Sequence, residues 1–163
     1  MKGLLSTMLP ALDAARLKAA NINPATGLAT DYLNHYNEVA MTIASLSDLP
    51  EMRASVLDWR PLGYPAHFIQ TRYSEQGLAI AAYIAAPRAV KTQFLAARAD
   101  LDSRVATVQR RIAADDQTPS AIADDAAAIF AGIAQLGGVI NGGRAATLLQ
   151  RSAEQDLVDS LFA

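Results

Sequence analysis

Cysteine is the first residue type that this chain of 163 residues lacks. Without a thiol, the protein can hold no disulfide, iron–sulfur cluster or thiolate zinc site, and it has no cysteine nucleophile. A chain of this length buries roughly 70% of its unfolded surface, so a hydrophobic core can stabilise it without crosslinks. The absence fits a reducing compartment, and we expect one cytoplasmic domain over residues 1–163.

The chain also lacks a basic surface and a long apolar run. Its formal net charge is −2, and its densest basic pairs are too sparse to follow a nucleic-acid backbone. The longest uninterrupted apolar run, LAIAAYIAA over 78–86, falls well short of the roughly 20 residues that span a bilayer. We therefore expect neither a nucleic-acid partner nor a membrane partner.

Patterns typical of β-strands are nearly absent, because no stretch alternates apolar and polar residues with β-branched enrichment. Alanine, the best helix former, is abundant. Apolar spacing and the breaks at proline and glycine predict helices over 3–20, 30–46, 50–58, 75–86, 87–115, 119–136 and 144–161, and a short one opening at Pro65. We expect an all-α fold, an antiparallel bundle of about four main helices with short connecting helices.

Apolar rows indicate which helix faces pack together. The longest predicted helix carries one row in register, formed by Val90, Phe94, Ala97, Leu101, Val105, Val108 and Ile112. The helix after Pro119 presents Ile122, Ala126, Ile129, Ile133 and Leu136, and the last helix presents Leu149, Ala153, Leu157 and Leu161. Gly137 and Gly138 read as the C-cap of the helix after Pro119. A narrow row on a long helix favours self-association, so we expect a homodimer.

The stretch TDYLNHYNEVAMTIASL, residues 30–46, puts chemically capable side chains on one side of a helix. Asp31, His35 and Glu38 share a narrow strip at i, i+4 and i+7, opposite a broad apolar face. We interpret the strip first as the solvent side of a structural helix. The same spacing is also competent for a metal, with His67 and Glu75 as the remaining source of ligands. No Glu-x-x-His, the pair typical of metal-binding bundles, occurs in the chain.

Two other functions of His35 remain open. A histidine phosphotransfer domain is also a small bundle, but such domains carry a lysine where this chain has Glu38, whose charge would repel a phosphoryl group. A general base is the other possibility, although only Thr42 lies on the same strip as a possible nucleophile.

The segment DWRPLGYPAHFIQTRYSE, residues 58–75, mixes aromatic and cationic side chains around two prolines. It predicts either an aromatic plug at the end of the bundle or a ligand pocket. If it is a pocket, we expect Arg60, Tyr64, His67 and Arg72 to line it and to favour an anion such as carboxylate or phosphate.

No competent catalytic set emerges from these motifs, and we expect no cofactor. The leading hypothesis is a non-enzymatic helical-bundle protein, possibly regulatory, that acts through self-association or a partner protein. The alternatives are a metal- or small-ligand-binding bundle using Asp31, His35 and Glu38 with His67, or a protein resembling histidine phosphotransfer domains.

Overall fold

The computed structural model describes residues 12–142. Among these residues there is no β-strand, only one isolated bridge between Ile22 and Ala29, and the structure is mainly helical. The predicted all-α class is therefore confirmed. The helix predicted over 144–161 lies outside the described residues, as does most of the helix predicted over 3–20, of which α2 (Ala14–Ala19) is the described end.

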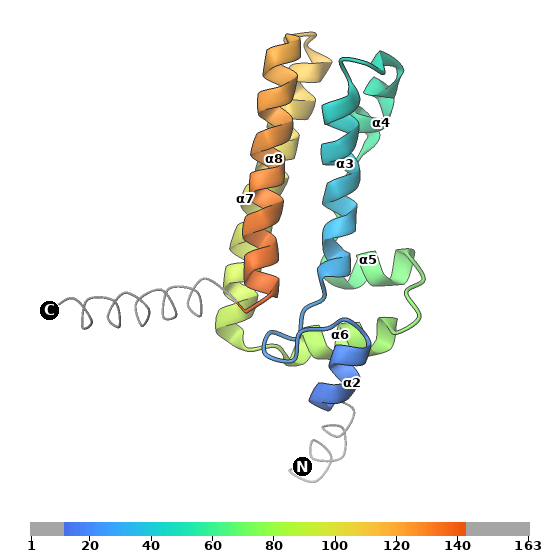
Figure 1. Cartoon of the computed structure of the whole chain (residues 1–163), viewed down its shortest axis with the longest axis vertical. Coiled ribbons are helices and arrows are strands. Elements are labelled where there is room, and N and C mark those ends of the chain that lie inside the picture. The colour runs from blue at the N-terminus through green and yellow to red at the C-terminus, as the bar shows by residue number, and fades with distance from the viewer. Residues whose placement is uncertain (1–11, 143–163) are drawn as a thin grey trace, which may run out of the picture.

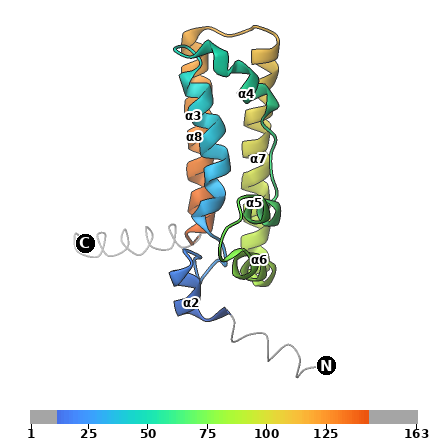
Figure 2. The ribbon, with the colours of Figure 1, turned by 90° about the vertical axis from the view of Figure 1, so that its right-hand side faces the viewer.

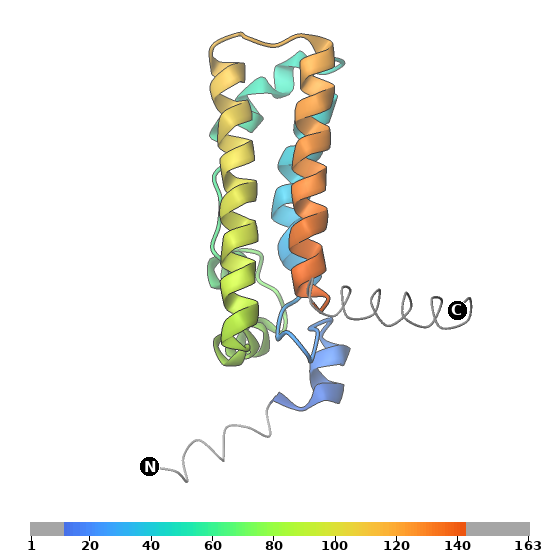
Figure 3. The ribbon, with the colours of Figure 1, turned by 90° about the vertical axis from the view of Figure 1, so that its left-hand side faces the viewer.

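Three long helices lie side by side along the long axis of the molecule (Figure 1). They are α3 (Asn34–Ser45), α7 (Arg88–Ala113) and α8 (Pro119–Ile140). α3 and α7 run in the same direction and α8 runs against both, as the colours in Figures 2 and 3 show. α8 packs on α7 and on α3, so its inward side supplies the centre of the core.

Short helices connect the long ones. η2 (Thr30–Leu33) leads into α3, and η3 (Pro50–Met52) leads into α4 (Arg53–Asp58), which packs on α3 and α7. α5 (Tyr64–Gln70) and α6 (Gln76–Ala85) pack together near the end of the bundle where α2 lies (Figure 1). Proline, tolerated in the first helical turn, opens η3, α5 and α8.

The apolar rows face inward as predicted. On α7 the buried members are Phe94, Leu101, Val105, Val108 and Ile112, and on α8 they are Ala126, Ile129, Ile133 and Leu136. Gly132 lets these two helices approach closely, because a Cβ there would lie 2.9 Å from Cδ1 of Leu101. The α7 row is thus buried within the chain itself, so it cannot supply the surface on which we based the homodimer.

The predicted C-cap at Gly137 and Gly138 is wrong, because α8 continues to Ile140 and its C-cap is Asn141. Gly137 is buried, and a Cβ there would lie 3.3 Å from Cδ1 of Leu33. Contact with the start of α3 therefore outweighs the weak helix propensity of glycine, which costs about 0.5–1 kcal/mol relative to alanine.

α8 also has a hydropathy that the sequence analysis did not single out. By length and composition it could cross a membrane, and it is the one helix in residues 12–142 that reaches both limits. The search for a long uninterrupted apolar run did not reveal α8, because polar residues separate the apolar residues of this helix. Core helices of soluble proteins meet the same limits, and much of this helix is buried against α7 and α3.

Candidate functional site

Tyr32, in η2, lies at the centre of a cluster of rings that we call the aromatic cluster. Its ring centroid is 5.8 Å from that of Tyr36, 5.3 Å from Tyr64, 5.5 Å from His67 and 5.4 Å from Phe94. These rings come from η2, α3, α5 and α7, and all are buried. The segment that the sequence presented as plug or pocket thus contributes Tyr64 and His67 to the core.

The aromatic cluster brings the two histidines together. The ring centroids of His35 and His67 are 6.3 Å apart. His35 is half-buried, stacked on Trp59 at 4.6 Å, with its Nε2 2.7 Å from the carbonyl oxygen of Arg60. The indole nitrogen of Trp59 donates in turn to the carbonyl oxygen of His35 at 3.2 Å. Main-chain and ring contacts therefore hold His35 in place.

His67 is the less satisfied of the two. Its side chain is buried, and its Nδ1 has no hydrogen-bond partner among the described residues. Burial lowers its pKa below the ordinary value, and the nearby charge of His35 lowers it further, while Asp31 acts in the opposite direction. His67 is therefore neutral at physiological pH.

The buried tyrosine hydroxyls of the cluster all have partners. Tyr32 donates to the carbonyl oxygen of Leu62 at 2.6 Å, and Tyr36 donates to Oδ1 of Asp102 at 2.6 Å. The Tyr64 hydroxyl accepts from the amide of Ala29 at 2.9 Å. Burial raises the pKa of each of the three phenols, so they stay protonated. A hydroxyl that is neutral and already bonded is suited to structure rather than to acid–base catalysis.

The four residues predicted to bind an anion are placed very differently from one another. Tyr64 and His67 are buried, whereas Arg60 and Arg72 are exposed. The Arg60 guanidinium donates to the carbonyl oxygens of Leu57 and Trp59, at 2.7 and 2.8 Å, so it caps the end of α4. Arg72 follows α5 in left-handed backbone, with φ of +53°. The binding of a ligand by these residues stays a prediction.

The predicted metal strip is only partly open to solvent. Glu38 is exposed, whereas Asp31 and His35 are half-buried. Within residues 12–142, no group of three or more His, Asp or Glu side chains is placed to hold a metal ion. For phosphotransfer, the Nε2 of His35 is engaged by a carbonyl and its ring is covered by Trp59, which restricts access to the nitrogen. The strip therefore does not form a metal site by itself, and its histidine is poorly placed for phosphotransfer.

An ion pair with a buried carboxylate was missed by the sequence analysis. Asp125 does not belong to the apolar row of its helix, but it is only 5% exposed. Its Oδ1 accepts a short hydrogen bond from Nη2 of Arg111, and its Oδ2 accepts from Nε2 of Gln117 at 3.2 Å. The basic doublet at 110–111 and the acidic doublet at 124–125 were the only sequence signals for it.

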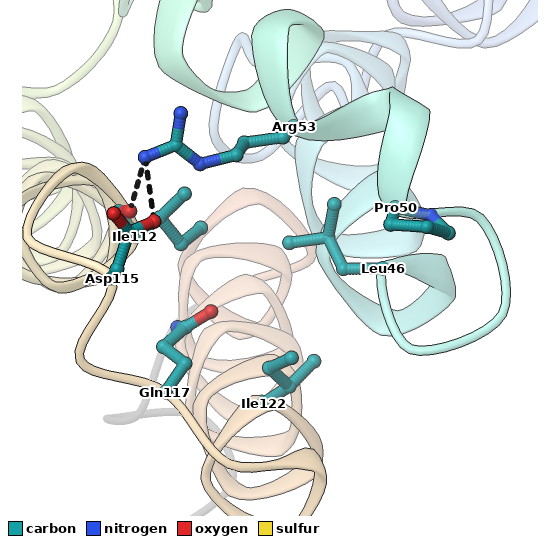
Figure 4. A pocket seen from close by; sticks show the side chains of 7 residues that line it. All are labelled: Leu46, Pro50, Arg53, Ile112, Asp115, Gln117 and Ile122. Carbon is teal, nitrogen blue, oxygen red and sulfur yellow. Dashed lines mark hydrogen bonds and ion pairs between the residues drawn. The ribbon is translucent and has the colours of Figure 1, made fainter.

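A second missed feature is a cavity of about 180 Å³ at the end of the bundle where α7 meets α8 (Figure 4). Arg53 closes one side, donating to the carbonyl oxygen of Ile112 at 2.9 Å and to Oδ1 of Asp115 at 3.1 Å. A cation at the C-terminal end of α7 suits the helix dipole. Leu46 and Ile122 also line the cavity. The guanidinium of Arg53 is already paired with Asp115, so the cavity offers a ligand little free charge.

α6 presents an uncharged outer face to solvent. It contains no charged residue, and its exposed positions include Gly77, Ala81, Ile84 and Ala85. Ile84 is 67% exposed, the highest value among the exposed large apolar side chains of the described residues. No family model, curated protein or solved structure matches this chain, so these features are interpreted from their own chemistry.

Proposed function

We propose that the protein acts by binding rather than by catalysis, and that it joins a second copy of itself through the outward face of α6. The observation that carries the proposal is Ile84, 67% exposed on a helix without charges. Small residues surround Ile84 on this helix, and Lys91, whose Nζ donates to the carbonyl oxygen of Ile84 at 2.6 Å, lies at its C-terminal end. An apolar centre with charge only at its edge is typical of protein–protein contacts.

The chemistry of the aromatic cluster supports binding over catalysis. The hydroxyls of Tyr32, Tyr36 and Tyr64 are engaged, and Nε2 of His35 lies against a carbonyl. A general base needs a free nitrogen within reach of a substrate proton. The half-buried His35 and the buried His67 do not meet that requirement. The partner chain and the cytoplasmic location stay predictions.

The full bundle belongs to the same proposal. α3, α7 and α8 are three main helices, and residues 144–161 would form the fourth, as their apolar spacing predicts. A fourth helix would run against α8, because a short connection joins antiparallel neighbours.

Light scattering coupled to size-exclusion chromatography tests the proposal on the full chain. We expect a dimer for the wild type and a monomer for Ile84→Glu, because a carboxylate would have to be buried at the interface. Met41→Glu is the matched control, since Met41 is 64% exposed on α3, and it should leave the dimer intact. A wild type that stays monomeric at high concentration contradicts self-association, and a dimeric Ile84→Glu variant contradicts the use of α6.

The alternative, a metal-binding bundle, has one observation in its favour, the 6.3 Å between the rings of His35 and His67. Two imidazoles are half of the four ligands that zinc usually takes. Titration with Zn²⁺ should then raise the melting temperature of the wild type and leave that of His35→Ala unchanged. Equal responses of the two proteins would count against this function.

A further inference from the structure

The outward side of α8 is a second uncovered apolar surface, which we call the α8 face. It consists of Ala127, Ala131, Ala134 and Gly138, all exposed, with Phe130 at one edge, 39% exposed, and the exposed Gln135 and Asp124 at the other. The sequence has no charged residue between Asp125 and Arg144. The outer side of a surface helix normally carries polar and charged residues, so this composition fits a face that is covered.

Gly138 adds a second observation. Its φ is not in the left-handed region, and a Cβ built there would meet nothing within 4 Å. Neither backbone conformation nor packing among residues 12–142 therefore accounts for a glycine that weakens the helix relative to alanine. Small residues on a helix face let another helix approach closely, as Gly132 does for α7 on the inward side.

Resting on the four-helix bundle proposed above, we propose that residues 144–161 pack as an amphipathic helix on the α8 face in particular. The chain continues from residue 143 to residue 163 directly beyond α8. Gly142 has a φ of +128°, which suits a reversal of chain direction. Residues 144–161 as a helix measure about 27 Å and α8 about 33 Å, at 1.5 Å per residue. The segment is thus long enough to cover most of the face.

The side chains of the segment are complementary to the α8 face. A tight reversal centred on Gly142 places residues equally far from it opposite one another. Leu157 then lies over Ala127, and Ala153 lies over Ala131. Leu157 fills the space that the small side chain of Ala127 leaves, and the facing Ala131 and Ala153 let the two helices approach closely.

The covalent connection favours this occupant over a second copy. A segment of the same chain pays no bimolecular entropy, and its tether keeps it at a high effective concentration. The attached helix therefore has an advantage over a separate chain at the same face.

Because the chain has no cysteine, an engineered pair provides a direct test. We expect Ala131→Cys with Ala153→Cys to form an intramolecular disulfide on mild oxidation of the full chain, detected by mass spectrometry. Ala131→Cys with Gln155→Cys is the control, since residue 155 lies on the opposite side of the proposed helix, and it should react about tenfold more slowly because pairing needs close Cα atoms. Equal rates, no disulfide in either pair, or a disulfide between two chains would overturn the proposal.

Limited proteolysis gives a second readout that needs no crosslink. In the full-length Ala131→Glu variant, trypsin should cut after Arg151 about tenfold faster than in the wild type, because the charge releases the segment. Ala44→Glu, an exposed alanine of α3, is the matched control and should not change the rate. Cleavage of the wild type as fast as that of Ala131→Glu would overturn the proposal.

Discussion

The aromatic cluster and the seam between α7 and α8 both bury polar groups, and they satisfy them differently. In the cluster the polar groups are neutral hydroxyls: Tyr32 and Tyr64 bond to the main chain of Leu62 and Ala29, and Tyr36 donates to the carboxylate of Asp102. In the seam, the buried carboxylate of Asp125 is held by the charge of Arg111 and by Gln117. The cluster therefore depends on ring packing and the seam on charge balance, so the two regions should respond differently to substitution.

The largest effect should come from Phe94→Ala, which removes a fully buried ring from the aromatic cluster. Loss of a buried phenylalanine with its cavity lowers the free energy of unfolding by about 3–5 kcal/mol. Leu95→Ala, at a neighbouring position that is 47% exposed, should change it by less than about 1 kcal/mol. Urea unfolding followed by circular dichroism measures both, and equal losses would show that the ring does not anchor the cluster.

Arg111→Met tests the seam and should have the second largest effect. It leaves the carboxylate of Asp125 buried with only Gln117 as a side-chain donor. Breaking a buried pair from one side costs about 3–5 kcal/mol, and the partial exposure of Arg111 reduces this to about 2–3 kcal/mol. Arg110→Met, at an exposed arginine of the same helix, should cost less than about 0.5 kcal/mol in urea unfolding. Similar costs for both would argue against charge balance.

Tyr36→Phe should have a smaller effect, about 1–2 kcal/mol, because it removes the hydrogen bond to Asp102 and keeps the ring. Tyr83→Phe is a useful comparison, since its hydroxyl has no hydrogen bond to a described residue, and it should cost less than about 0.5 kcal/mol. The comparison fails if the two variants have the same midpoint in urea.

The smallest effect should be a dependence of stability on pH at His67. Burial lowers the pKa of His67 in the folded protein below its ordinary value of 6.5. Between the two values the unfolded chain binds more protons, so stability is complete above about pH 6.5 and decreases as the pH falls towards the folded-state pKa. Urea midpoints from about pH 7.5 down to about pH 5 measure the decrease. His67→Leu should flatten the curve, and an unchanged slope would assign it to other groups.

The packed faces could be predicted from the sequence because burial follows helical period. Phe94, Leu101 and Val105 were assigned to the apolar row of their helix, and each is fully buried. The ion pairs Arg98–Asp102 and Asp100–Arg104 of the same helix join residues four apart, at 3.5 and 2.9 Å. Spacing along one helix determines these features, so a single sequence contains them.

The features that were missed depend on contacts between distant segments. Asp125 is buried only because Arg111, on the other long helix, reaches it. α8 continues through Gly137 because Leu33 packs against this glycine. The approach of His35 to His67 requires α5 to fold against the start of α3. Periodicity assigns a face to each residue, but it does not say which helix will lie across from that face.

Thr26 connects the loop after α2 to the C-terminal end of α8, because its buried hydroxyl donates to the carbonyl oxygen of Ile140 at 2.6 Å. Residues 12 and 142 consequently leave the helices at the same end of the molecule (Figure 1). The opposite end, where Arg53 bonds to Asp115, is therefore the better place to attach a surface anchor or a label that must stay clear of residues 12 and 142.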